Sequence, residues 1–377
     1  MLATSRPRSG ARGIARVLAV AIGACLALGV LPELASAKIV AVPVREGLEV
    51  PVGFTFAPDG RIFYTEKEAD AGNGQVRIID RAANTNTLFY EFTDVSSAGE
   101  RGVLGVALHP DYPATPEVFV YVTRRPAPAD PLENEIVRLI DDDGSGTSPE
   151  IIWSAPVAEP RTNHNGGRIL FGPDEMLYAV VGDGGLEPGN AQDLDDDRGK
   201  VLRMDTDGNA PVDNPFAGSV VWAYGIRNSF GMAFDPHTGF LWETENGPAC
   251  NDELNRIREG QNYGWGASQT CSGQDPFNTN QDGPNVVLPQ RWWTPTIAPV
   301  GAVFCRGCRL GPKSRGRMFW GSRQQGLIRR TTLNEPRTRI KRIEKLLSGN
   351  NVVALEAGPS GRLFFSTFDG IYRLDRR

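Results

Sequence analysis

A histidine and an aspartate stand at the two ends of one segment, HNGGRILFGPDEMLYAVVGD, which runs from His164 to Asp183. Gly-Pro-Asp at 172–174 is a strong turn signal, and apolar residues lie on both sides of it. If residues 168–171 pair with residues 177–181, His164 and Asp183 come to the same end of a hairpin. Together they could act as a general base and the carboxylate that orients it. A packed histidine and an ordinary Gly-Asp turn are the alternative.

A second polar stretch, YGIRNSFGMAF, places Arg227 and Asn228 just before an expected strand. A fixed guanidinium there could stabilise an anion or a developing oxyanion, although a surface salt bridge would use the same residue type. The next stretch, ETENGPACNDELNRIREGQNYGWG, combines acidic side chains with the backbone carbonyls of Gly247 and Pro248. Oxygen ligands of these kinds suit calcium. The acidic run at 193–200 lacks EF-hand spacing and is expected to be a solvated loop.

The elements that would position these residues repeat along the chain. Six copies of a turn followed by a strand are centred on prolines, at Pro58, Pro110, Pro173, Pro236, Pro312 and Pro359. Helical periodicity is weak, and 43 glycines and 28 prolines punctuate short apolar blocks. The sequence therefore predicts an all-β fold, a six-bladed β-propeller with four-stranded antiparallel blades. A β-sandwich or barrel is the alternative.

Four polar stretches are expected to be loops rather than strands, and to line one mouth of the central channel. They are residues 96–105, the opening segment with 182–185, residues 192–214 and residues 224–265. Function is expected at this mouth.

The first 37 residues resemble a secretory signal peptide. Four arginines precede an apolar run of about fifteen residues, and a small-residue cleavage site ends at Ala37. Residues 38–377 are then the mature propeller, periplasmic or secreted, with no stable membrane insertion; a lipid anchor at Cys25 is the less favoured alternative. The net charge is −5, and we expect no basic stripe on the surface. Nucleic acid is therefore not an expected partner.

The mature chain keeps four cysteines, and an even number in an exported protein favours disulfides. Three connectivities are possible. Proximity in the sequence favours Cys250 with Cys271 and Cys305 with Cys308. A zinc site at the second pair is the competing interpretation.

As a set, these motifs resemble the soluble pyrroloquinoline-quinone (PQQ) dependent aldose and glucose-sorbosone dehydrogenase family. The matching stretches include ERGVLGVALHPDY, HNGGRILFGPDEMLYAVVGDGG, VWAYGIRNSFGMAFDPHTGFLWETENGP and DELNRIREGQNYGWG, in the family's order. The resemblance implies that His164 is the general base toward an aldose and that Asp183 orients it. Arg227, with Asn228 beside it, would stabilise charge on the bound quinone.

The resemblance also implies calcium. The carbonyls of Gly247 and Pro248 would hold the ion that clamps PQQ, and Glu245 with the Tyr263 carbonyl would bind a neighbouring calcium. An external electron acceptor, a quinone or a redox protein, would reoxidise the cofactor. Whether the chain is a monomer or a homodimer is left open.

Several positions depart from the family's pattern. Glu100 stands where the family has a glutamine that contacts the cofactor, so its carboxylate is expected to repel the PQQ carboxylates unless it is protonated or turned away. Gln324, Asn351 and Val353 stand where the family places cations toward those carboxylates. The nearby arginines Arg323, Arg329 and Arg330 are candidate replacements.

The favoured function is PQQ- and calcium-dependent oxidation of aldoses at the anomeric carbon to lactones. One alternative is a propeller of the same lineage that binds carbohydrate or protein without redox chemistry. Another is a calcium-dependent propeller hydrolase, for example a lactonase, that uses His164 and a metal-bound water.

Overall fold

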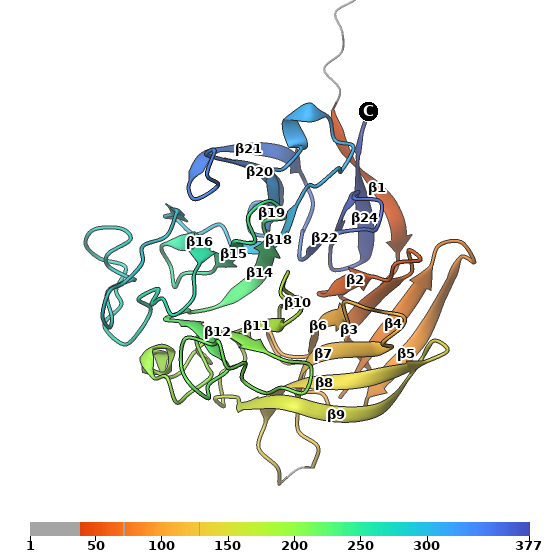
Figure 1. The fold of residues 1–377 in the computed structure, drawn as a ribbon, viewed down its shortest axis with the longest axis horizontal. Coiled ribbons are helices and arrows are strands. Elements are labelled where there is room, and N and C mark those ends of the chain that lie inside the picture. Colours follow the sequence, from red (N-terminus) through yellow and green to blue (C-terminus); the bar gives the residue numbers. More distant parts are fainter. Residues whose placement is uncertain (1–37, 71, 128) are drawn as a thin grey trace, which may run out of the picture. The chain divides into compact units, whose positions relative to one another are not determined.

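The computed structural model describes residues 38–70, 72–127 and 129–377, so the expected signal peptide lies outside the described residues. Six four-stranded antiparallel sheets are arranged around a centre (Figure 1), which confirms the predicted propeller. Blade one contains β2 (Phe54–Phe56), β3 (Ile62–Asp70), β4 (Asn73–Asp80) and β5 (Thr85–Phe92). Blade two contains β6 (Val103–Leu108), β7 (Glu117–Arg124), β8 (Glu133–Asp142) and β9 (Ser145–Pro156).

The remaining blades follow in chain order. Blade three contains β10 (Ile169–Phe171), β11 (Leu177–Val181), β12 (Lys200–Met204) and β13 (Val221–Tyr224). Blade four contains β14 (Ser229–Phe234), β15 (Leu241–Glu245), β16 (Asp252–Ile257) and β17 (Arg291–Trp293). Blade five contains β18 (Pro299–Phe304), β19 (Met318–Ser322), β20 (Leu327–Leu333) and β21 (Ile340–Ser348). Blade six contains β22 (Leu355–Ala357), β23 (Leu363–Ser366), β24 (Gly370–Arg376) and β1 (Ile39–Glu46).

Blade six closes the ring by joining the two ends of the described chain. β1 pairs antiparallel with β24, from Ile39 opposite Arg376 to Glu46 opposite Gly370 (Figure 1). The Arg377 N–H also donates to the Lys38 carbonyl at 2.9 Å. This pairing makes the first described strand the outer strand of the last blade, so blade six contains strands from both ends of the described chain.

The second strand of each blade is covered on both faces by neighbouring strands and blades. β11, LYAVV, is buried at every position, and β7 is buried over VFVYVT. Outer strands such as β21 alternate between half-buried and exposed residues. The core therefore lies mainly between blades, where Phe63 and Val76 of blade one pack with Val106 and Val118 of blade two.

The six predicted proline turns all join the first and second strands of a blade. Each four-residue turn closes with a backbone hydrogen bond from the N–H of its fourth residue to the carbonyl of its first, the residue before the proline. The N–H to carbonyl pairs are Gly60 to Ala57, Tyr112 to His109, Glu175 to Gly172, Thr238 to Asp235, Ser314 to Gly311 and Gly361 to Gly358, at 2.8 to 3.2 Å. Proline sets φ for the first central position of such a turn, which explains its recurrence. At Pro312 the turn continues into a short 3₁₀ helix, Pro312–Ser314.

The expectation that four polar stretches contain no strands is wrong for three of them. β6 begins at Val103, β12 lies inside 192–214, and β14, β15 and β16 lie inside 224–265. These strands bury polar side chains that find partners inside the fold: Lys200 Nζ donates to two backbone carbonyls at 2.7 and 2.8 Å. Polarity therefore did not mark these segments as loops.

The only helices in the described ranges are two short 3₁₀ segments, and none of the described helices could cross a membrane.

Candidate active site

The hairpin predicted around the first candidate pair is present. β10 pairs with β11, with Ile169 opposite Ala179, so the residues before β10 and after β11 meet at one end of blade three. There His164 Nδ1 lies 2.5 Å from Asp183 Oδ1, and the Gly184 N–H donates to the His164 carbonyl at 3.2 Å. His164 has a φ of 61°, which is costly for a residue with a Cβ. The surrounding fold thus holds this imidazole in a strained position beside a buried carboxylate.

Asp183 is fixed by three donors. Its Oδ1 accepts from His164 Nδ1 and from the Gly185 N–H at 2.8 Å, and its Oδ2 accepts from the Trp265 indole N–H at 2.6 Å. Burial alone would raise the pKa of Asp183, but these hydrogen bonds and the imidazole lower it below its ordinary value. An ionised Asp183 requires the proton on Nδ1, which leaves the Nε2 lone pair free to accept a proton.

Arg227 lies directly beside this pair. Its carbonyl accepts from the Asp183 N–H at 2.9 Å, its own N–H donates to Glu245 Oε1 at 2.5 Å, and its Nη1 donates to the Asn246 carbonyl at 2.6 Å. The guanidinium carbon lies 5.2 Å from the centroid of the Trp265 ring. Burial lowers the pKa of Arg227, while the surrounding carboxylates, Asp183 first, raise it. The site therefore holds a fixed, desolvated cation next to the histidine.

Glu100 connects the segment before blade two with the histidine loop and with blade four. Its Oε2 accepts from the His164 N–H at 2.6 Å and from Asn228 Nδ2 at 2.9 Å. This carboxylate oxygen is therefore turned toward the protein. The carboxylate thus positions both the histidine backbone and the asparagine side chain.

Two adjoining cavities form the mouth of the channel at this end of the blades. Charged and aromatic residues that line the first include Lys67, Glu100, Arg168, Phe230, Arg323 and Phe368. The second is lined by Asn246, Gly247, Asp252, Thr296, Ala298, Arg323, Gln324, Asn351 and Phe368. Arg323 and Phe368 belong to both, and the Arg323 guanidinium lies 4.9 Å from the centroid of the Phe368 ring.

Three positions lie at this mouth where the family pattern has cations and this chain has neutral residues. Gln324 and Asn351 line the second cavity, and Val353 lines the first. Arg323 is the proposed replacement that reaches them. Arg329 and Arg330 line neither mouth cavity, because both lie within β20, where Arg330 pairs with an acidic residue of β21.

Lys67 is another cation at the mouth, and it was not predicted from the sequence. Its Nζ donates to the Ser97 carbonyl at 2.5 Å. Burial lowers the pKa of Lys67, and Glu68 and Glu100 oppose that shift. The blade repeat could have indicated Lys67. It lies toward the end of the second strand of blade one, and Asp183 follows the second strand of blade three, so the two occupy similar positions in their blades.

The predicted calcium loop follows β15. The Gly247 N–H donates to Asp252 Oδ1 at 2.8 Å, and Asp252 Oδ2 accepts from the N–H groups of Ile297 and Ala298 at 2.5 and 2.7 Å. Among the described residues, no donor bonds the carbonyl oxygens of Gly247 or Pro248. Two unbonded carbonyls on a loop fixed by Asp252 suit a hard cation.

Three buried carboxylates lie behind this loop on β15 and β16. Asn255 Nδ2 lies 3.2 Å from Glu243 Oε2, 3.2 Å from Glu245 Oε2 and 3.0 Å from Glu253 Oε2. Burial raises the pKa of Glu243 to about 8, that of Glu253 to about 7, and that of Glu245 well above its ordinary value. Asn255 Oδ1 is buried without a partner among the described atoms.

The Tyr263 carbonyl, predicted to bind calcium together with Glu245, accepts from Asn280 Nδ2 at 2.8 Å. In the described part of the chain, no group of three or more His, Cys, Asp or Glu side chains is arranged so that it could hold a metal ion. The carboxylate cluster nevertheless supplies the oxygen atoms that calcium prefers, with an amide nitrogen now at its centre.

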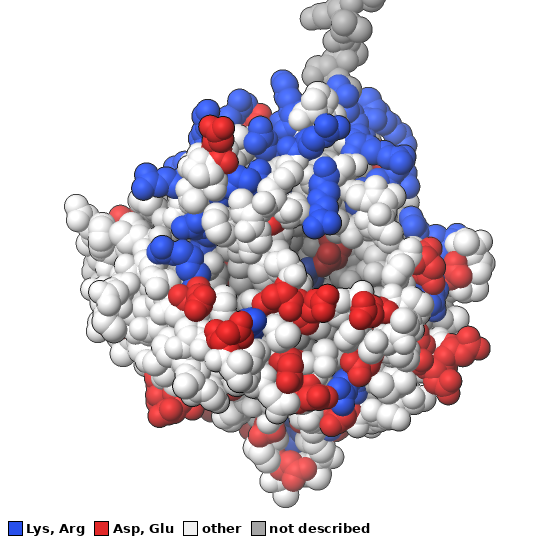
Figure 2. All heavy atoms as spheres, in the orientation of Figure 1, with Lys and Arg blue, Asp and Glu red and all other residues white. Residues whose placement is uncertain are grey.

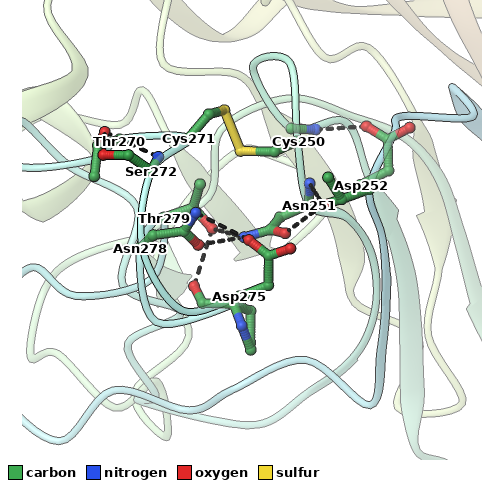
Figure 3. The surroundings of a disulfide bond; sticks show 12 residues. Cys250, Asn251, Asp252, Thr270, Cys271, Ser272, Asp275, Asn278 and Thr279 are labelled. Carbon is green, nitrogen blue, oxygen red and sulfur yellow. Dashed lines mark hydrogen bonds between the residues drawn. A yellow bond between two sulfur atoms is a disulfide. The ribbon is translucent and has the colours of Figure 1, made fainter.

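Both predicted disulfides are present, Cys250 to Cys271 and Cys305 to Cys308. The first joins the loop after β15 to the long loop before β17 (Figure 3). Beside it, Asn251 Nδ2 donates to Asn278 Oδ1 at 2.7 Å and to Thr279 Oγ1 at 2.8 Å (Figure 3). The zinc interpretation of the second pair is therefore wrong, because both thiols are used in a disulfide.

This chain combines a six-bladed propeller with a buried histidine and aspartate that lie beside a half-buried arginine at one end of blade three. The chain matches the Glucose / Sorbosone dehydrogenase family over residues 48–373 and belongs to that family, which confirms the resemblance.

An uncharacterised protein of Synechocystis is 32% identical to this chain over 351 residues, which cover 88% of this chain and 84% of that protein. The aldose sugar dehydrogenase YliI of Escherichia coli is 26% identical over 86% of this chain and 88% of its own length. The PQQ-bound structure of an aldose sugar dehydrogenase from Streptomyces coelicolor superposes with a TM-score of 0.75, at 29% identity, over 91% of this chain and 99% of that one.

Proposed function

We propose that this protein oxidises aldoses at the anomeric carbon to lactones, with PQQ and calcium, and passes the electrons to an external acceptor. The single observation that carries this proposal is the His164 and Asp183 pair, with Nδ1 and Oδ1 2.5 Å apart, close in the chain to Gly166 and Gly167, which line the mouth. Nε2 of the imidazole makes no hydrogen bond among the described residues. Family membership and the PQQ-bound relative support it.

The residues of this chain supply the acid-base part of the reaction. His164 Nε2 takes the proton of the anomeric hydroxyl, while the hydrogen on the anomeric carbon leaves as hydride and the carbonyl of the lactone forms. Asp183 stabilises the imidazolium that results, because it is ionised and hydrogen-bonded to Nδ1. PQQ, when bound, supplies the two-electron acceptor for the hydride. Arg227 places a positive charge where negative charge develops.

The mouth fits a planar anion with three carboxylates in part. Lys67 and Arg323 supply cations, while Gln324 and Asn351 supply amide donors instead of charges. Glu100 uses one oxygen for two internal hydrogen bonds, which reduces its repulsion of a bound anion. We therefore expect binding that is weaker than a fully cationic clamp would give.

Two calcium positions are proposed. The unbonded carbonyls of Gly247 and Pro248 would hold the ion next to the cofactor. Glu245, with Glu253 and the Tyr263 carbonyl, would hold a second ion. Rotation of Asn255 would then turn its unpartnered Oδ1 toward that cation.

Residues 1–37 are proposed to be a signal peptide that directs residues 38–377 to the periplasm or the exterior. Two disulfides in the described chain support an oxidising compartment.

The test is a titration of PQQ into the purified mature protein with calcium present, followed by dye reduction on addition of aldoses. Saturable binding and sugar-dependent reduction are expected. His164→Ala should bind PQQ about as well as the wild type and lose turnover by about 10²- to 10⁴-fold, the range for a general base.

Absence of binding at tens of micromolar PQQ would overturn the proposal. Calcium-dependent lactone hydrolysis without PQQ would point to the hydrolase instead.

A further inference from the structure

Charge is strongly segregated along this chain. Residues 301–377 carry 17 Lys and Arg against five Asp and Glu, a net +12, whereas residues 38–300 carry 19 against 39, a net −20. Figure 2 shows Lys and Arg gathered over blades five and six. The expectation of no basic stripe is therefore wrong, because the net charge of −5 sums two opposed regions. The positive field of blades five and six attracts anions.

At the edge of this basic region, a groove runs between the outer strand of blade four and the outer strands of blade five. It is lined by Arg291, Trp293, Gln325, Arg329, Ile343 and Lys345. Three of these are cations and none is acidic. The groove shares no lining residue with the two mouth cavities.

The pairing of β20 with β21 places like charges opposite each other in this groove. The like charges are those of Arg329 and Lys345, which are directly opposite each other. The next cross-strand pair differs, because Arg330 is opposite Glu344 and the two form an ion pair at 2.9 Å. Directly opposed like charges destabilise a sheet unless an anion lies near both.

No described carboxylate lies within ion-pair distance of any of the three groove cations. Arg329 is 4% exposed, and its guanidinium carbon lies 5.0 Å from the centroid of the Trp320 ring. Its Nη2 donates to the neutral Gln325 amide oxygen, and its Nη1 is buried with no acceptor among the described residues. Burial lowers the pKa of Arg329, which reflects the cost of a desolvated charge without a counterion. The indole face attracts this cation but does not neutralise it.

Arg291 and Trp293 lie two residues apart on β17 and so project to the same side of that strand. The Trp293 ring packs against Trp320, with the two centroids 5.1 Å apart. The groove thus has an aromatic wall on one strand and two further cations on the facing strands. This combination suits an oxyanion group on a small cyclic or linear molecule.

We propose that this groove binds a carboxylate or phosphate group of a small anionic ligand, such as a sugar acid or a sugar phosphate, between Arg291 and the Arg329 and Lys345 pair. The site is separate from the mouth and does not depend on PQQ.

The test is isothermal titration calorimetry of the mature protein without PQQ, at low ionic strength, with inorganic phosphate and D-glucuronate as probes and D-glucose as the neutral control. Saturable binding of at least one oxyanion and none of glucose is expected. Lys345→Ala and Arg291→Ala should each weaken it about 5- to 20-fold, because each removes one charge-assisted contact that water partly screens. Both side chains are exposed, so neither change should disturb folding.

Lys341→Ala is the matched control, because Lys341 is an exposed lysine of the same strand that does not line the groove. It should change binding by less than about twofold, since it makes no contact there. Binding of phosphate alone or glucuronate alone would identify which oxyanion the groove selects. Lack of any saturable binding would overturn the proposal, as would an equal loss in the Lys341 variant, which would mean that only diffuse surface charge attracts the probe.

Discussion

Replacement of Asp183 by asparagine tests the geometry of the proposed base most directly. The wild-type carboxylate accepts from three donors, on His164, Gly185 and Trp265. An asparagine has one acceptor oxygen and one NH₂ group, so one side must present a donor to a donor. If the NH₂ faces His164, the ring proton moves to Nε2 and the imidazole can no longer accept a proton from the sugar.

If the amide oxygen faces His164 instead, the Trp265 bond is lost and the negative charge beside the imidazolium is still missing. A hydrogen bond to a charged group contributes about 1.5 to 3 kcal/mol, and a general base contributes about 10²- to 10⁴-fold in rate. We therefore expect Asp183→Asn to lower kcat by about 10²- to 10⁴-fold and to change PQQ affinity by less than about threefold, because the carboxylate does not line the mouth cavities.

The assay is steady-state dye reduction with saturating PQQ and calcium, together with thermal melts to verify folding. Asp195→Asn is the control, because it neutralises an exposed carboxylate elsewhere in the chain. A decrease in kcat of less than about threefold, or one no larger than the control shows, would refute the orienting role.

The same variant has a predictable effect on stability against pH. The pKa of Asp183 is lowered in the folded protein, so its contribution to stability is present above the ordinary value of 3.8 and is lost as the pH falls below it. Acid titration of unfolding should show this loss in the wild type and less of it in Asp183→Asn.

Three further predictions concern the cofactor, the metal and the disulfide. Glu100→Gln keeps an acceptor oxygen but removes a negative charge from the mouth, so fluorescence titration should show PQQ binding about 3- to 10-fold tighter; weaker binding would mean that the charge itself organises the site. A chelator should lower the melting temperature, and more so as the pH rises from about 5 to 8. The raised pKa values of Glu243 and Glu253, about 8 and 7, mean that the metal-free folded protein loses stability over this range, because these carboxyls ionise at lower pH in the unfolded chain than in the folded protein; a chelator effect independent of pH would contradict the second calcium position. Cys271→Ser opens a disulfide that spans 21 residues and should cost about 3 kcal/mol in urea unfolding; a loss below about 1 kcal/mol would show that the surrounding amide contacts hold the loop by themselves.

Some of the fold and site follows from short stretches of sequence. The hairpin joins His164 to Asp183, which are 19 positions apart, and depends on a local turn, so turn chemistry and strand periodicity were enough to predict it. The six proline turns were predictable for the same reason. The pairing of Cys250 with Cys271 was chosen by proximity, and the structure agrees.

The polar strands could not be predicted in this way. Lys200 is fully buried in β12, and burial lowers its pKa to about 8. Its partners are backbone carbonyls of the preceding loop, whose position depends on the folded blade. A sequence shows that a residue is polar, but only the tertiary structure shows whether its polarity is satisfied inside.

By itself, then, the sequence determined the blade repeat and the local histidine and aspartate pair, because these depend on hydrogen bonds between residues close in the chain. Packing of the blades around the channel decided the rest. It brought Trp265 to Asp183 across 82 positions and Asn228 to Glu100 across 128 positions. Contacts of that span are set by how six blades pack around one channel, and a local sequence pattern does not encode them.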